Sequence, residues 1–435
     1  MNDNKKIKAK FILNRRINAY TLLLESIIFV FLGVYILFWA KSITLIPFIV
    51  SVALLFRSLH ALLLVFTRKS FIRNIFECVI NALMGIIFYL NPSYLRSIFG
   101  IALGLYLLLL AFISILSAYF YKRNSSPGTA RNIFVAIMQI VIAILSILNP
   151  SVILLRLRII VGIYLLIFAV TSFIDFLIQI IPQSTKSRVR RRMRVTLPNI
   201  FSAFIPVGIY KELKKSNLLG KNIVEGDVDN VDIEVFIHAS EVFPGQMGHL
   251  DFCIGGRVLS YGNYDESSYY LWGLAGDGVL EVIDKEAYLQ FCISYSKKII
   301  ISFGLKLDEE QKKRVESKVL EIMEDTELWE PEAARKKSHS LRSSKEMSDY
   351  ASELYKATNA KFYKFTSSIY KTYFTFNRNC VKLGDEVLGV LGIDELASFG
   401  LITPGKYYSY FDREFRKNNS FVKVRRIYAA NSDLV

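Results

Sequence analysis

The chain has 435 residues, of which 52% are hydrophobic, and it carries a formal net charge of +16. Apolar residues concentrate in roughly the first 180 positions, while the remainder has the mixed composition of a soluble domain. This imbalance excludes a single uniform globular domain and predicts a membrane half followed by a soluble half.

The first half contains six apolar stretches, each close to the roughly 20 residues that cross a bilayer as a helix. They lie at 20–39, 44–66, 75–90, 95–119, 133–148 and 152–180. Because these stretches have almost no polar face, they do not fit the buried helices of a soluble protein. The sequence therefore predicts six membrane-spanning helices.

An internal repeat organises these stretches. "RNIF" begins at positions 73 and 131, and "LNPS" begins at 90 and 148, at the same offset in both cases. Each unit reads as helix, Asn-Pro turn, helix, and the first pair of stretches fits the same plan. We therefore expect three repeated helical hairpins.

Basic residues indicate the orientation and a surface partner. Lys and Arg cluster at 5–16, 68–73, 122–131 and 186–194, all on one predicted side, so both termini are expected to be cytoplasmic. The basic juxtamembrane linker 184–196 attracts anionic lipids by ~1 kcal/mol per residue near the surface. We expect the lipid bilayer, and not nucleic acid, as the partner; oligomerisation through the membrane domain is left open.

The repeats and their Asn-Pro turns resemble the HdeD-like family of small membrane proteins over about residues 17–181. The resemblance implies six spans built from repeated hairpins and names no reactive residue. The expected domains are a basic N-terminus at 1–16, the membrane domain at 17–183, the linker at 184–196, a soluble domain at 197–400 and a basic tail at 401–435.

The soluble half reads as short strands with a few helices. Strands are predicted at 231–239 and 297–305, two more surround the turn at Gly255 and Gly256 within 248–265, and an amphipathic helix spans 308–325. The polar segment 331–350 reads as a loop or short helices. A helix is predicted at 380–392, and a surface helix at 407–417.

Cys380 and His249 are the candidate reactive residues. A helix N-terminus and a nearby imidazole both activate a thiol, and Cys380 opens a predicted helix while His249 opens a predicted strand. His238, in the middle of a strand, is a rival base that reads better as a packed histidine, and an inert buried Cys380 is the plain alternative. No zinc spacing, phosphate loop or dinucleotide motif occurs, so we expect no metal and no cofactor.

The stretches "GHLDFCIGGRVLSYG" and "FNRNC" resemble the circularly permuted papain-like hydrolases, which include lecithin–retinol acyltransferase-like and NlpC-like proteins. The resemblance covers about residues 232–392. It implies an α+β papain-like domain with an antiparallel sheet, Cys380 as nucleophile and His249 as base. Ser260, Tyr261 and Asn263 are the candidates for the third, orienting residue, and Tyr261 is preferred.

The expected function is a membrane-anchored thiol hydrolase, amidase or acyltransferase. It would act on an ester, amide or thioester bond of a lipid, lipidated or peptide substrate near the cytoplasmic membrane surface. The alternative is a non-enzymatic membrane stress-response protein whose papain-like domain is an inactive binding module.

Overall fold

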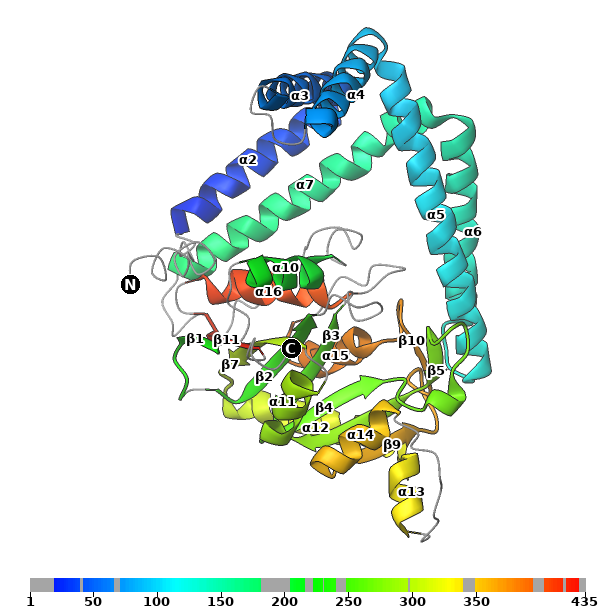
Figure 1. Ribbon diagram of the computed structural model, residues 1–435, viewed down its shortest axis with the longest axis vertical. Helices are drawn as coiled ribbons and strands as arrows, with labels where there is room; N and C mark the ends of the chain where they lie inside the picture. The colour runs from blue at the N-terminus through cyan, green and yellow to red at the C-terminus, as the bar shows by residue number, and fades with distance from the viewer. Residues whose placement is uncertain are drawn as a thin grey trace. The chain divides into compact units, whose positions relative to one another are not determined.

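The computed structural model (Figure 1) describes residues 19–39, 42–65, 71–180, 204–215, 222–229, 231–239, 248–295, 298–338, 349–393, 403–417 and 420–429. One unit, here the helical unit, comprises Tyr20–Ile115 and Arg131–Phe176. The other, here the sheet unit, comprises Met1–Ala19, Leu116–Ala130 and Leu177–Val435. The basic segments expected at 1–16 and 184–196 lie outside the described residues.

Six apolar helices follow one another at the positions expected from the sequence. They are α2 (Ala19–Phe38), α3 (Ser42–Val65), α4 (Phe71–Leu90), α5 (Pro92–Arg123), α6 (Thr129–Leu148) and α7 (Pro150–Ile180). Five of them are long and apolar enough to cross a membrane, whereas the apolar part of α4, Asn74–Leu90, is shorter. A multi-pass membrane protein is therefore confirmed, with five of the six predicted spans.

The repeated Asn-Pro pairs mark helix boundaries, as predicted. Helix α5 begins at Pro92 directly after Asn91, and α7 begins at Pro150 directly after Asn149. Proline suits the first position of a helix because it has no N–H to leave unpaired and its φ is already helical.

Small residues join the helices of the helical unit in pairs. The Ser26 hydroxyl donates to Ala169 between α2 and α7, and the Ser51 hydroxyl donates to Gly85 between α3 and α4. Ser114 donates to Gln139 between α5 and α6. Such hydrogen bonds and close backbone approaches are typical of membrane helix contacts. They join helices of different repeat units, so the contacts do not show the hairpins expected within each unit.

The sheet unit is built on one nine-stranded antiparallel sheet in the order β1-β11-β7-β2-β3-β4-β6-β9-β8, with a separate pair of β10 and β5. The strands are β1 (Ile223–Gly226), β2 (Ile233–Ala239), β3 (His249–Ile254), β4 (Arg257–Gly262), β5 (Ala275–Asp277), β6 (Val279–Asp284), β7 (Ile299–Leu305), β8 (Thr326–Trp329), β9 (Lys361–Phe365), β10 (Thr372–Phe374) and β11 (Val422–Tyr428). An antiparallel sheet was expected here, and its individual strands at 231–239, 248–265 and 297–305 are confirmed.

Helices pack on both faces of this sheet. One core contains side chains of α10 (Ile205–Lys215), α12 (Glu309–Glu324), α15 (Cys380–Gly389) and α16 (Pro404–Phe415). The other contains side chains of α11 (Lys285–Ser294) and α14 (Tyr350–Thr358). Successive residues of a strand therefore face different helices, because side chains alternate across a sheet. Asp308 and Gln311 form a capping box at the start of α12, as the sequence indicates for Asp308.

The last part of the chain belongs to the sheet, although the sequence reads there as a basic tail. Strand β11 lies between β1 and β7, and α16 buries Tyr407 and Phe411 completely, so it is not a surface helix. Arg425, one of the basic residues that suggested a solvated tail, is paired: its guanidinium lies 2.6 Å from Asp412 and 2.6 Å from Glu225. In the 331–350 segment the structure has α13 (Glu332–Ser338), and 339–348 lie outside the described residues.

Candidate active site

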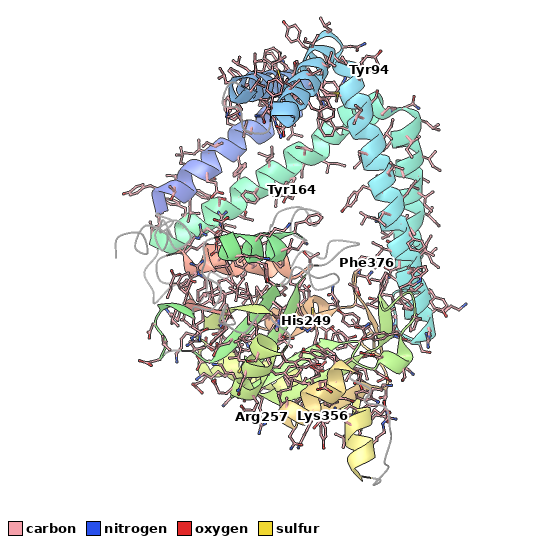
Figure 2. All side chains as sticks on the ribbon, viewed as in Figure 1. Tyr94, Tyr164, His249, Arg257, Lys356 and Phe376 are labelled. Carbon is pink, nitrogen blue, oxygen red and sulfur yellow. The ribbon has the colours of Figure 1, made fainter. Side chains whose placement is uncertain are left out.

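His249 is the first residue of β3 and lies inside the sheet unit, where β3 runs beside α15 (Figure 2). Its cross-strand neighbour in β2 is His238. Gly248 precedes it with φ +84°, and a Cβ at that position would lie 3.0 Å from the His238 carbonyl oxygen. The entry to β3 therefore requires glycine, which brings the chain close to β2 and places His249 at the start of the strand.

Cys380 opens α15, and the helix start is well capped. The Asn379 side chain accepts hydrogen bonds from the backbone N–H groups of Val381 and Lys382 in the first turn of the helix. The Cys380 sulfur accepts a hydrogen bond of 3.4 Å from the backbone N–H of Leu250. The cap and this contact bring the thiol to the start of β3.

Gly384 allows α15 to approach β3 closely. A Cβ at Gly384 would lie 2.6 Å from the ring of Phe252 and 2.7 Å from the side chain of Leu250. Both of these side chains belong to β3. A glycine one turn after Cys380 therefore sets how close the thiol comes to the sheet.

Three side chains surround one ring nitrogen of His249. Its Nε2 lies 2.9 Å from Asp251 Oδ1, 3.0 Å from Ser260 Oγ and 3.2 Å from the Tyr264 hydroxyl. The two hydroxyl groups are themselves 2.7 Å apart. The Cys380 sulfur lies at the same end of β3, because it accepts its hydrogen bond from the backbone N–H of Leu250, the residue after His249.

Asp251 is the centre of this network and is completely buried. Besides His249, its carboxylate lies 2.6 Å from His238 Nε2 and accepts a 2.7 Å hydrogen bond from the Tyr288 hydroxyl. A buried carboxylate is stable only when such donors replace the water that it has lost. His238 is therefore a second partner of Asp251, in keeping with its expected role as a packed histidine.

The charges of the network are set by competition between burial and ion pairing. Burial alone would lower the pKa of His249, but the Asp251 carboxylate and the Cys380 sulfur outweigh it and hold that pKa well above its usual value. Burial would raise the pKa of Asp251, but His249 and His238 hold it well below its usual value. Burial lowers the pKa of His238 to about 4, against the opposing effect of Asp251. At neutral pH the network thus holds a cationic His249, an anionic Asp251 and a neutral His238.

Glu281 is a second buried carboxyl group beside this network. It lies on β6 directly opposite Ser260 of β4, and its side chain is 0% exposed. Among the described residues neither of its carboxyl oxygens has a hydrogen-bond partner. Burial, together with the negative charge of Asp251, raises the pKa of Glu281 well above its usual value and so favours the neutral acid.

Of the three candidates for the orienting residue, only Ser260 is placed at the His249 ring. The preferred candidate, Tyr261, instead donates a 2.9 Å hydrogen bond to the Tyr370 carbonyl, and Asn263 donates to another backbone carbonyl. The reason is strand alternation: Ser260 points to one face of β4 and Tyr261 to the other, where α15 packs. The preference for Tyr261 is therefore corrected.

Asp251 and Tyr264 are contacts of His249 that the sequence reasoning missed. Asp251 had a signal, because it lies two residues after His249 in an otherwise apolar strand and must share its face. Tyr264 follows β4 and has no such signal, since only the path of the chain after the strand brings it back to the ring.

The other cysteines of the sheet unit are not activated. Burial raises the pKa of Cys253 to about 11 and that of Cys292 to about 12, so both thiols stay protonated and inert. Among the residues that the structure describes, no three His, Cys, Asp or Glu side chains are arranged to hold a metal ion.

The segment that leads into Cys380 packs on the last turns of α5, which belong to the sheet unit. The ring of Phe374 lies 5.1 Å from that of Phe120, edge to face. The guanidinium of the buried Arg378 lies 3.9 Å from the centre of the Tyr121 ring. Aromatic and cation–π packing therefore joins the end of a membrane-capable helix to the segment that carries the thiol.

Residues 76–145 match a family described as a short repeat of unknown function (DUF308). The chain has no significant similarity to the curated proteins or to the solved structures compared with it. The match and the apolar helices support the resemblance of the N-terminal half to the HdeD-like membrane proteins. The match ends at residue 145, before the segment 232–392 that resembles the papain-like hydrolases, so that resemblance stays a prediction.

Proposed function

We propose that this protein is a six-span membrane protein whose sheet unit is a permuted papain-like thiol hydrolase, amidase or acyltransferase. Cys380 is the nucleophile, His249 the base and Asp251 the residue that orients the imidazole. The observation that carries the proposal is the position of His249, whose Nε2 lies 2.9 Å from Asp251 Oδ1 and which directly precedes Leu250, the residue whose backbone N–H donates to the Cys380 sulfur. A nucleophile, a base and an orienting group in this relation are the signature of covalent catalysis.

The charges of the network suit acyl transfer. A cationic imidazole favours the thiolate form of a thiol beside it. The Cys380 thiolate attacks the carbonyl carbon of an ester, amide or thioester, and the carbonyl oxygen becomes an oxyanion. The backbone N–H of Cys380, at the positive end of α15, is the proposed donor to that oxygen.

In the following steps His249 first donates a proton and then accepts one. His249 gives its proton to the leaving group as the carbon–heteroatom bond breaks, and a thioester to Cys380 remains. The neutral imidazole then takes a proton from water or another acceptor, which attacks the thioester and releases the thiolate. Asp251 keeps the ring in one orientation throughout and stabilises its cationic form.

The membrane half supports a substrate at a lipid surface. The apolar helices and the basic linker at 184–196 would tether the site near anionic lipids, with both termini on the cytoplasmic side. The proposed substrate is therefore a lipid, a lipidated molecule or a peptide that carries an ester, amide or thioester bond.

The reactivity of Cys380 tests this proposal. The full-length protein in lipid nanodiscs is treated with iodoacetamide across pH ~6–9, and each cysteine is followed by peptide mass spectrometry. We expect Cys380 to react faster than Cys78, although Cys380 is buried and Cys78 is half-buried. His249→Ala should slow Cys380 selectively, and His60→Ala, on α3, is the matched control. If Cys380 reacts as slowly as the inert Cys292, the enzyme proposal fails.

The burial of Cys380, which is 3% exposed, favours a second candidate function. In that case the sheet unit is an inactive papain-like binding module, and the membrane half acts in the stress response. Slow Cys380 labelling that does not respond to His249→Ala would support this alternative.

A further inference from the structure

One aromatic turn of the sheet unit exposes a tryptophan almost completely. The turn runs from Tyr269 to Gly273, between the short helix η2 (Glu266–Ser268) and β5, and Trp272 is 97% exposed. Leu271 and Trp272 have φ of 51° and 55°, in the left-handed region that side chains with a Cβ rarely adopt. A strained backbone that holds an indole in the open points to a function for that indole.

The turn is held in place and is not a loose loop. Tyr270 and Ala275 close it through two backbone hydrogen bonds of 3.0 and 3.3 Å. The Asn263 side chain donates a 2.8 Å hydrogen bond to the Gly273 carbonyl at the tip. The surrounding structure thus fixes the position of Trp272 and compensates for the strain of its backbone.

The turn lies beside the end of a membrane-capable helix within the same unit. The ring of Tyr270 lies 5.9 Å from that of Phe120, and the guanidinium of Arg123 lies 5.3 Å from the centre of the Tyr270 ring. Phe120 and Arg123 belong to the last turn of α5, and β5 and β10 lie next to it in Figure 1.

The residues at this end of α5 indicate the membrane surface. The helix has 32 residues, so it is about 48 Å long, whereas the hydrocarbon core of a bilayer takes up about 30 Å. The basic Lys122 and Arg123 end it, and Tyr119, one turn earlier, is exposed. Exposed aromatic and basic side chains at a helix end mark the level of the lipid headgroups.

We propose that the Tyr269–Gly273 turn is an interfacial anchor, with the Trp272 indole placed among the headgroups of the bilayer that α5 crosses. Indole suits that layer because its ring is apolar and its N–H needs a polar partner. The proposal does not depend on catalysis. It extends the proposed function, because β5 pairs with β10, and β10 leads into the segment that carries Cys380.

Lipid quenching of Trp272 tests the anchor. The chain has three tryptophans, so Trp39→Phe/Trp329→Phe leaves Trp272 as the only indole in the full-length protein. The protein is placed in nanodiscs whose phosphatidylcholine carries bromines at one of several depths. We expect strong quenching by bromines near the headgroup end of the acyl chain, weaker quenching by deeper bromines, and a blue-shifted emission.

The matched control is Trp39→Phe/Trp272→Phe, which leaves Trp329 on β8. That indole should not respond to brominated lipid, and protection of the buried Cys292 from alkylation shows that both variants are folded. If brominated lipid does not quench the Trp272 emission but aqueous acrylamide does, the proposal is overturned. Shielding from both quenchers would also overturn it, in favour of a protein contact. Neither result bears on the reactivity of Cys380, so the two proposals can fail separately.

Discussion

Glu281 gives a direct test of the electrostatics of the candidate site. Glu281→Gln keeps the size and the neutral charge of the buried acid but removes its proton equilibrium. The folded-state pKa of Glu281 is raised well above the ordinary value of 4.5. Above pH 4.5 the unfolded chain therefore releases a proton that the folded chain still holds. The stability that the group contributes below pH 4.5 is lost as pH rises towards the folded-state pKa.

The size of the effect follows from this linkage. Within that window each pH unit lowers the free energy of unfolding of the wild type by about 1.4 kcal/mol, or tenfold in the equilibrium constant. Glu281→Gln lacks this loss. The ratio of the wild-type unfolding equilibrium constant to that of the variant should therefore grow tenfold per pH unit above pH 4.5 and then level off. His238, whose pKa is lowered to about 4, has the opposite slope between about 4 and 6.5. It is present in both proteins, so its effect cancels in their ratio.

Alkylation of the buried Cys292 measures this stability in the full-length protein. Cys292 is 0% exposed, so a reagent reaches it only when the sheet unit opens. When closing is fast, the rate of modification is proportional to the opening equilibrium. The chemical reactivity of the thiol at a given pH is the same in both proteins, so the ratio of their rates gives the ratio of their stabilities.

An exposed carboxylate provides the control. Glu327 lies on β8 with its side chain in solvent, so Glu327→Gln should leave the ratio of rates independent of pH. Two results would refute the conclusion that Glu281 is buried as a neutral acid. One is a ratio of Cys292 modification rates, wild type to Glu281→Gln, that does not change with pH. The other is a wild type that is more stable than the variant at pH 8.

Two further substitutions test the geometry of the site. Asp251→Asn removes the anion that holds the pKa of His249 high, so an NMR titration of His249 should move to lower pH and Cys380 alkylation near neutral pH should slow. An unchanged His249 titration would exclude Asp251 as its partner. Gly384→Ala should destabilise the sheet unit by about 1–3 kcal/mol through overpacking and slow the reaction of Cys380. The control Gly208→Ala, where a Cβ meets nothing within 4 Å, should be neutral or stabilising. Equal effects of the two glycine substitutions would contradict the close approach of α15 to β3.

Local signals are what make much of this protein predictable. The membrane helices follow from composition, and the repeated Asn-Pro pairs mark where α5 and α7 begin. The β3–β4 hairpin follows from Gly255 and Gly256, which both have positive φ in its turn. Asn379 caps α15 at the residue before Cys380, as an Asn before a helix should.

The orienting residue of His249 depends on which face of the sheet each side chain takes. Within one strand the choice between Ser260 and Tyr261 depends on strand register, and a shift of one residue reverses it. Asp251 shares a face with His249 because the two lie two residues apart in β3, but its pairing with His238 depends on the adjoining strand β2. Such pairings join residues distant in the chain, so no local pattern contains them.

The sequence by itself determined the two halves of this protein, the helix boundaries of the first half, and the strand and helix that carry His249 and Cys380. These features depend on composition and on short-range rules of backbone conformation. Only the tertiary structure decided that the basic C-terminal strand β11 enters the sheet, because Arg425 and Arg426 bury their charges against carboxylates from distant segments. It also decided the network of Asp251, because a buried charge is stable only where the fold gathers its partners.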